Sequence, residues 1–340
     1  MEERRRGRAW LLALAALLVA CTPAGAVVPS PPSTAPVPTG AQVSGPPLSV
    51  RAMTWNVLGG PVPDDWFPRI ARDELDPMVR APGVVAKVEV ADPDVVGLQE
   101  FQNGTESAAW ITEHLPGYTW LPGPDNHAIA LRTTRFEVAA TGNERVNTAG
   151  EQGAILDRYV DWVRARDRVS GRTVLVLDLH AHAWQSPQLA AVRSLAIDRL
   201  VDLVGRLDPG LFEPLVLLGD FNARDDETRP TYRDHLVKLR AAGLVDAHAV
   251  AAKDTSDVRR ASSLQLMAAS VAGEPVAKVI RRKDQRIDYV WVPKGTTVRT
   301  WAVLSGPGVR WQRVRGVRVP AWTGIVPSDH SPVVADLRFR

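Results

Sequence analysis

Short apolar runs separated by polar turns dominate the chain from residue 49 onward. Runs of about four to eight apolar residues bounded by turn residues are typical of buried strands. The pattern predicts strands at residues 49–57, 94–100, 127–132, 135–140, 158–169, 173–183, 214–223, 286–293, 296–305 and 331–339. Strands outnumber helices, and the two are interspersed without strict alternation. This favours a two-sheet α/β architecture over a Rossmann fold.

Helical periodicity is clearest in residues 186–207. Ser186 can cap this helix, and Pro187 falls in its first turn. One face is apolar, formed by Leu189, Val192, Ala196, Leu200 and Leu203.

Other segments are less regular. Shorter helices are predicted at residues 104–115 and from about Tyr232 to Gly243. Residues 71–90 read as helical in parts, with Pro77 and Pro82 expected to interrupt them. Residues 250–283 are mixed and predict no element.

The first twenty residues have the pattern of an export signal. A basic "MEERRRGR" precedes the apolar "AWLLALAALLVA", which is too short to span a bilayer comfortably. "LLVAC" then places Cys21 in a sequence that resembles the bacterial lipobox, in which the cysteine after the cleavage site carries lipid. We expect residues 1–20 to direct export and Cys21 to anchor the protein at the outer face of the cell membrane. Cleavage near "TPAGA" and free secretion is the alternative.

A Pro-rich tether is predicted between this anchor and the folded body. Residues 21–48 contain "VVPSPPSTAPVPTGAQVSGPP", whose Pro, Ser, Thr and Gly cannot bury a core. The folded domain is then residues 49–340, enough for one substantial core. Cys21 is the one cysteine of the chain, so no internal disulfide can form.

Composition and charge leave the partner open. The chain is 45% apolar and 23% charged, the profile of a soluble globular protein. Four arginines against two glutamates in the first twenty residues give +2 of the formal +3. The remainder is near neutral, so net charge argues neither for nor against a nucleic-acid partner.

Polar side chains recur where the apolar runs end. A rigid sheet holds such groups in fixed positions at a cleft. They are Asn56, Glu100, His180, Asp220 with Asn222, and Asp329 with His330; Asp288 lies within the predicted strand 286–293.

This set suits metal-assisted attack of water on phosphate. Carboxylates such as Glu100 are the hard oxygen ligands that Mg²⁺ prefers, and a histidine beside a carboxylate can act as a general base. Amide and imidazole groups can donate to phosphoryl oxygens as charge develops. With few scattered histidines and no second cysteine, Zn²⁺ is less expected than Mg²⁺ or Mn²⁺. No GxGxxG, GxxxxGK[ST] or HExxH motif is present.

The motifs "TWNV", "GLQE", "HAIALR", "GDFNA", "RIDYV" and "SDHSPV" follow one another in the order seen in a known family. From Ser49 to Arg340 the chain resembles the endonuclease/exonuclease/phosphatase superfamily. The resemblance implies a four-layer α/β sandwich, in which two packed mixed β-sheets are flanked by helices. It also implies divalent-metal-dependent cleavage of phosphoester bonds. By this resemblance Glu100 is the principal metal ligand, Asn56 belongs to the same site, and Asp329 supports it.

The resemblance also implies catalytic roles. His180 resembles the histidine that contacts the scissile phosphate, and Asn222 the residue that steadies the transition state. Asp220 resembles the residue that positions or activates the attacking water. His330 resembles the catalytic histidine, with Asp288 as its carboxylate partner. Whether Asp220 or His330 is the general base stays open.

Markers of particular branches are absent or altered. Ala223 and Arg224 stand where phosphoinositide phosphatases tend to have Tyr-Arg, and no Tyr-x-Pro-Asn segment of abasic-site endonucleases is present. Around the histidine, "DLHAHA" replaces the "NTHLDH" of many relatives. The sequence therefore predicts the chemistry better than the substrate.

Three functions remain in view. The arginine-rich segments "RWQRVRGVR" (310–318) and "RRKDQR" (281–286) favour an exported nuclease or nucleotide phosphodiesterase with nucleic acid as its partner; for residues 281–286 a solvated loop is the slightly favoured reading. A sphingomyelinase-like phospholipid phosphodiesterase or a monoester phosphatase is the alternative. A surface binding protein on a dead scaffold is least favoured, because every polar residue of the site is present. No obligate protein partner is evident.

Overall fold

The computed structural model describes residues 46–60, 62, 72–183, 186–211, 213–257, 262–263, 266–269, 277–280, 285–305, 309–314, 317–322 and 324–340. The predicted export signal, Cys21 and most of the predicted tether lie outside these residues. Within the described part of the chain, no helix has the length and apolar character needed to cross a membrane.

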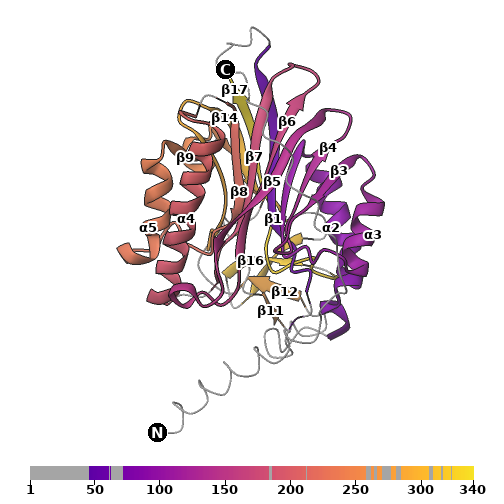
Figure 1. The fold of residues 1–340 in the computed structure, drawn as a ribbon. Coiled ribbons are helices and arrows are strands. Elements are labelled where there is room, and N and C mark those ends of the chain that lie inside the picture. Colours follow the sequence, from indigo (N-terminus) through magenta and orange to yellow (C-terminus); the bar gives the residue numbers. More distant parts are fainter. Residues whose placement is uncertain are drawn as a thin grey trace. The chain divides into compact units, whose positions relative to one another are not determined.

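Two mixed β-sheets form the centre of the domain (Figure 1). One has seven strands in the order β10-β14-β17-β1-β2-β4-β3, and the other has six in the order β5-β6-β7-β8-β13-β9. The seven strands are β1 (Leu48–Asn56), β2 (Val95–Gln99), β3 (Tyr118–Pro122), β4 (Ala128–Arg132), β10 (Lys253–Asp254), β14 (Thr297–Val303) and β17 (Val333–Phe339). The six strands are β5 (Phe136–Asn147), β6 (Arg158–Asp167), β7 (Thr173–His180), β8 (Leu215–Asp220), β9 (Leu244–Asp246) and β13 (Asp288–Pro293).

The main core lies between the two sheets. Val50 and Val95 of the seven-stranded sheet and Val176 and Val216 of the six-stranded sheet belong to one buried cluster. The central strands are apolar on both faces because each sheet also has a covered outer face. Continuous apolar runs such as residues 174–177 therefore signal central strands.

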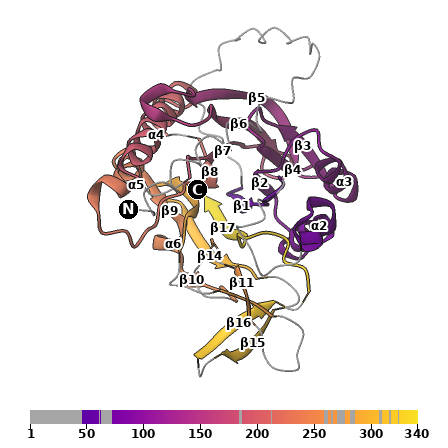
Figure 2. The same ribbon diagram turned by 90° about the horizontal axis from the view of Figure 1, so that it is seen from below.

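Helices cover both outer faces. α2 (Pro77–Ala91) and α3 (Glu106–His114) pack on the seven-stranded sheet, and α4 (Pro187–Leu207) and α5 (Pro230–Ala241) pack on the six-stranded sheet (Figures 1 and 2). The short elements are η1 (Arg72–Leu75), η2 (Glu151–Gly153) and α6 (Ala247–Val250). The order helix, sheet, sheet, helix confirms the predicted four-layer sandwich.

The predicted helix at residues 186–207 is confirmed as α4. The Leu189 N–H donates to Oγ of Ser186 over 3.1 Å, and Pro187 occupies the first turn. Such a cap stabilises a helix by about 1 kcal/mol. α5 begins at Pro230 rather than near Tyr232, because proline is well suited to the first helical position.

The expectation that Pro77 and Pro82 interrupt a helix is wrong. Pro77 begins α2, where its missing N–H would have no partner, and the Met78 N–H donates to the cap Asp76 over 2.7 Å. Pro82 lies inside α2 and removes one hydrogen bond. The helix continues because its apolar face, including Val84, is buried against the sheet.

A third, four-stranded sheet arises from segments in which the sequence predicted no strands. Its order is β11-β12-β16-β15, with β11 (Leu266–Ala269), β12 (Ala277–Ile280), β15 (Val309–Val314) and β16 (Val317–Trp322). Figure 2 shows β15 and β16 reaching away from the large sheets. Isolated bridges join Ser263, just before β11, to Gln285 and His330. This sheet is therefore connected to the edge at which the candidate site lies.

Candidate active site

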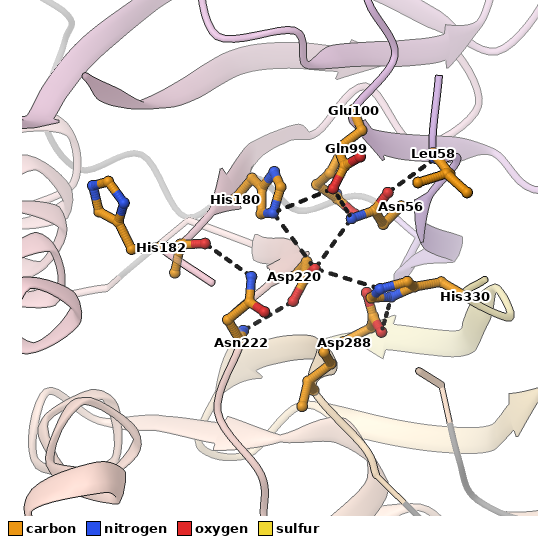
Figure 3. Close-up of polar contacts among 12 residues, drawn as sticks. Asn56, Leu58, Gln99, Glu100, His180, His182, Asp220, Asn222, Asp288 and His330 are labelled. Carbon is orange, nitrogen blue, oxygen red and sulfur yellow. Dashed lines mark hydrogen bonds and ion pairs between the residues drawn. The ribbon is translucent and has the colours of Figure 1, made fainter. Parts of the chain in front are cut away.

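Four of the predicted site residues come together at one edge of the two large sheets (Figure 3). Asn56, His180 and Asp220 are the last residues of β1, β7 and β8, and Glu100 directly follows β2. β1 is parallel to β2, and β7 is parallel to β8, with His180 paired to Asp220. Parallel neighbours end at the same edge, so the strand pairing places these side chains around a common space.

Asp288 and His330 reach this edge by another route. Asp288 begins β13, which runs antiparallel to β8, and lies directly opposite Asp220. His330 precedes β17 and is fixed by its backbone. The indole N–H of Trp55 donates to the His330 carbonyl over 2.9 Å, and the His330 N–H donates to Oγ of Ser328 over 3.0 Å.

Asp220, Asp288 and His330 form a buried group whose ligand atoms all lie within 4.8 Å of one another. Nδ1 of His330 donates to Oδ2 of Asp288 over 2.9 Å, and its Nε2 lies 3.8 Å from Oδ2 of Asp220. Burial alone would lower the pKa of His330, but the carboxylates of Asp288 and Asp220 hold it well above its usual value. Burial, and then the charge of Asp288, raise the pKa of Asp220 to about 7. The imidazole is therefore charged at neutral pH, while Asp220 is able to exchange a proton.

Asn56 connects two carboxylates of the site. Its Nδ2 donates to Oε1 of Glu100 over 2.8 Å and to Oδ2 of Asp220 over 3.2 Å. Its Oδ1 accepts the Leu58 N–H over 3.0 Å, which fixes the orientation of the amide. Asn56 therefore orients Glu100 and Asp220 toward the same space.

Glu100 and Asp329 fit a divalent cation. Glu100 is half-buried and adopts a left-handed φ of 55°, the kind of backbone strain that occurs at functional sites. Burial, and then the charge of Asp329, raise the pKa of Glu100. Oδ1 of Asp329 is buried and has no hydrogen-bond partner among the described residues. Oxygen donors of this kind are the ligands of Mg²⁺ and Mn²⁺, and a cation would offset their repulsion.

His180 and Asn222 complete the set. Nε2 of His180 lies 3.6 Å from Oδ2 of Asp220 and 3.8 Å from Oε1 of Glu100. Burial, and then the charge of Arg158, lower the pKa of His180 well below its usual value, so the ring is neutral. The Asn222 N–H donates to Oδ1 of Asp220, and its side-chain amide donates to the Ala181 carbonyl, both over 2.9 Å.

Arg158 is a residue of the site that the sequence did not reveal. It begins β6, is buried, and its Nη1 lies 3.1 Å from both carboxylate oxygens of Asp125. Its charge also affects the pKa of Glu100 and of His180. In the sequence it stands at the start of an ordinary strand pattern, so no local signal distinguishes it from a surface arginine.

The two predicted basic segments have different outcomes. In residues 281–286, the first four lie outside the described residues. Arg286 is buried, with Nη2 2.6 Å from Asp246 and 2.9 Å from Asp225. For Arg286, the prediction of a solvated loop and the prediction of contact with a polyanion are therefore both wrong. In residues 310–318, Arg313 is exposed and lies directly opposite Arg318 in the β15–β16 pair. Arg315 lies outside the described residues.

Comparisons with known proteins agree with this fold. The model of the Endonuclease/Exonuclease/phosphatase family matches residues 53–330. A search of curated proteins found no match. Among solved structures, an endonuclease/exonuclease/phosphatase family protein of Bacteroides thetaiotaomicron is 22% identical, with a TM-score of 0.64 over 86% of this chain and 99% of that one.

Two further solved structures are similar in fold. A mannosyl-6-phosphatase of Bacteroides thetaiotaomicron is 21% identical, with a TM-score of 0.61 over 85% of this chain and 99% of that one. TDP2 of D. rerio, complexed with a single-strand DNA product, is 14% identical, with a TM-score of 0.53 over 85% of this chain and 98% of that one.

Proposed function

The chain belongs to the endonuclease/exonuclease/phosphatase family, and from that premise we propose that it hydrolyses phosphodiester bonds of nucleic acid with Mg²⁺ or Mn²⁺. Members of the family are phosphoesterase hydrolases, and dependence on a divalent metal is usual among them. The observation that carries the proposal is the buried Asp220–His330–Asp288 group beside the linked pair Asn56 and Glu100.

The metal would be held by Glu100 and Asp329, with Asn56 keeping Glu100 in place. When bound, a divalent ion there stabilises the negative charge that develops on the phosphoryl oxygens. The residues themselves bind the phosphate, orient it and transfer the proton.

We assign the general base to Asp220. Its pKa of about 7 suits a group that takes a proton from water at neutral pH. His330 is already protonated because Asp288 holds its pKa well above the usual value, so it can donate to the phosphoryl group but not accept a proton. We assign to neutral His180 and to the side-chain amide of Asn222 the role of steadying the phosphoryl oxygens; one amide hydrogen of Asn222 is held by the Ala181 carbonyl, which orients the group.

Two observations support nucleic acid as the substrate class. Arg313 of β15 is exposed, and an exposed arginine can contact a backbone phosphate. A similar fold, TDP2 of D. rerio, was solved with a single-strand DNA product.

A phosphomonoester is the second candidate. Arg158 is paired with Asp125, but its charge also affects the pKa of Glu100 and of His180, and positive charge near the site would favour a doubly charged terminal phosphate. The similar fold of a mannosyl-6-phosphatase supports the same reading. A phospholipid would become the preferred substrate if the predicted lipid anchor at Cys21 holds the protein at the outer face of the membrane.

The test is a set of parallel assays on the protein and on Asp220→Asn. Nicking of supercoiled plasmid is measured with Mg²⁺ and with chelator, and phosphate release is measured from a hexose 6-phosphate. Metal-dependent nicking that Asp220→Asn lacks supports the nuclease. Phosphate release without nicking supports the monoester phosphatase. If neither reaction occurs, nucleic acid and the phosphomonoester are rejected as substrates, and a phospholipid remains as the candidate substrate.

A further inference from the structure

Arg80 of α2 is a buried arginine that binds four main-chain carbonyls. The residue is 2% exposed. Its Nε donates to the Leu75 carbonyl over 3.1 Å, and its Nη1 donates to the carbonyls of Val57 over 3.1 Å and of Pro327 over 2.9 Å. Nη2 donates to the Leu58 carbonyl. The guanidinium therefore joins three separate segments of backbone.

Two of these segments continue into residues of the proposed metal site. Val57 and Leu58 directly follow Asn56. Pro327 lies two residues before Asp329. The two segments are remote in the sequence and come together only in the fold. Because one guanidinium binds both, it fixes how far apart they lie.

The first of these segments also holds the backbone of Glu100. The Val57 N–H donates to the Gln99 carbonyl over 2.9 Å, and the Gly59 N–H donates to the Glu100 carbonyl over 2.8 Å. A Cβ at Gly59 would lie 2.2 Å from that carbonyl oxygen, so only glycine permits this approach. The segment therefore connects Arg80 to Glu100.

The backbone of this segment is strained. Leu58 has a left-handed φ of 50°, which costs a non-glycine residue about 1–3 kcal/mol and persists only where surrounding contacts impose it. Its N–H donates to Oδ1 of Asn56 over 3.0 Å, and its carbonyl accepts from Arg80. The hydrogen bond from Arg80 therefore helps to maintain the strained backbone that orients the Asn56 amide.

Ser328 joins the same two segments by separate hydrogen bonds. Its Oγ donates to the Asn56 carbonyl over 2.6 Å and accepts the His330 N–H over 3.0 Å. Like Arg80, Ser328 is buried. Asp329 lies between Ser328 and His330 in the chain, so its backbone is fixed on both sides.

The guanidinium also acts on the acids of the site through its charge. Burial lowers the pKa of Arg80 to about 10, and the charges of Asp329 and then of Glu100 oppose this decrease. Arg80 is therefore charged at neutral pH. Its positive charge is close enough to offset part of the repulsion between the two carboxylates.

We propose that Arg80 is a positioning residue of the metal site, which keeps the backbone of Glu100 and Asp329 in one fixed arrangement, with Ser328 as a second tie. This inference rests on the metal site of the proposed function. Loss of contacts that position metal ligands typically costs about 10- to 100-fold in metal affinity. Lysine would keep the charge, but its single nitrogen lacks the planar fork of donors that reaches several carbonyls at once.

Binding of Mn²⁺ in the absence of substrate tests this role. Free Mn²⁺ is measured by electron paramagnetic resonance in titrations of the protein, Arg80→Gln, Arg80→Lys and Ser328→Ala, with folding checked by circular dichroism. Arg206→Gln is the matched control, because Arg206 is an exposed arginine on α4. We expect both Arg80 variants to raise the Kd for Mn²⁺ by about 10- to 100-fold. Ser328→Ala should raise it by about 2- to 10-fold, as for a lost hydrogen bond, and Arg206→Gln should leave it unchanged.

An arginine that only stabilises the fold would give variants with a lower melting temperature but an unchanged Kd for Mn²⁺ in the folded state, and this result would overturn the inference. A normal Kd in Arg80→Lys would also overturn it, because charge alone would then be sufficient. If neither Arg80 variant folds, Ser328→Ala decides. A raised Kd in Ser328→Ala supports the tie between the segments, and a Kd equal to that of the control contradicts it.

The same titration separates this inference from the proposed function. Unmodified protein that binds no Mn²⁺ would reject the metal site and the role of Arg80 with it. Binding of Mn²⁺ without hydrolysis of a phosphodiester would reject the proposed nuclease and leave the positioning role intact.

Discussion

Asp220 and Asp288 are directly opposite each other on the neighbouring strands β8 and β13, so two buried carboxylates share one pocket. Like charges in this position destabilise a sheet. His330 compensates, with Nδ1 2.9 Å from Asp288 and Nε2 3.8 Å from Asp220. The charge of Asp288 raises the pKa of both Asp220 and His330, so its loss would change the proton affinity of these two groups together.

Asp288→Asn tests this coupling. Loss of the carboxylate removes the charge that raises the pKa of His330, so the imidazole loses its proton at lower pH. We expect kcat/KM to fall by about 10²–10⁴, the usual contribution of a positioned proton-transfer group. The pH profile of kcat/KM and the NMR titration of His330 provide the measurement. The exposed Asp202→Asn on α4 is the control, and equal profiles for the two variants would contradict the coupling.

Asn56→Ala should weaken metal binding while leaving the fold intact. The variant removes the amide that holds Glu100 and Asp220, and loss of such a positioning contact typically costs about 10- to 100-fold in metal affinity. A titration of activity with Mg²⁺ measures the apparent Kd. The exposed Asn143→Ala on β5 should match the unmodified protein. An unaltered Kd for Asn56→Ala would show that the amide does not position the ligands.

Arg158→Gln should raise KM for an anionic substrate by about 10- to 100-fold, because charge-assisted hydrogen bonds contribute about 1.5–3 kcal/mol. It should also raise the pKa of His180, since the charge of Arg158 is one cause of its low value. The variant leaves Asp125 unpaired, so Asp125→Asn/Arg158→Gln is needed to separate binding from stability. Steady-state kinetics of both variants and of the exposed Arg145→Gln provide the comparison. A normal KM in the double variant would remove Arg158 from the site.

Lys87→Met should change how stability depends on pH. Lys87 is buried behind Trp55, and burial lowers its pKa from 10.5 to about 8, against a smaller opposing effect of Asp257. Between these values the unfolded chain binds more protons than the folded protein, so the free energy of unfolding rises with pH. The rise is at most about 3 kcal/mol, at about 1.4 kcal/mol per pKa unit.

Urea denaturation at about pH 7.5 and about pH 10 measures this difference, the linkage slope being set by the protons bound in each state. Lys87→Met should lack the part of the rise that comes from Lys87. The exposed Lys294→Met should retain it. A rise of equal size in the two variants would mean that Lys87 keeps an ordinary pKa in the folded protein.

Much of the candidate site could be predicted from sequence because its signal is local. Asn56, His180 and Asp220 each end an apolar run, and such a change from apolar to polar at a strand end is visible without knowing the sheet. Asp288 lies at the start of a strand, yet it reaches the same edge because β13 is antiparallel to β8. The same runs predicted a two-sheet α/β architecture, and the four-layer order was implied by the resemblance to the family.

The remainder depends on pairings that no local pattern reveals. Asp161 and Asp178 lie within ordinary strands, and they meet His127 only because the two sheets pack face to face. Arg158 is buried for the same reason. The helix prediction failed at Pro82. The one hydrogen bond that Pro82 removes costs less than burial of the apolar face of α2 contributes. The strands β11 and β12 have only four residues each, which is too short for a pattern, and the brief alternation at the start of β15 ends at Arg313.

The most direct test of the central claim is the initial rate of bis(p-nitrophenyl) phosphate hydrolysis by the protein and by Asp220→Asn, each with Mg²⁺ and with chelator. The account predicts metal-dependent hydrolysis, slower by about 10²–10⁴ in Asp220→Asn because the general base is lost. A rate that persists in chelator, or that is the same in Asp220→Asn, would contradict the assignment of this site.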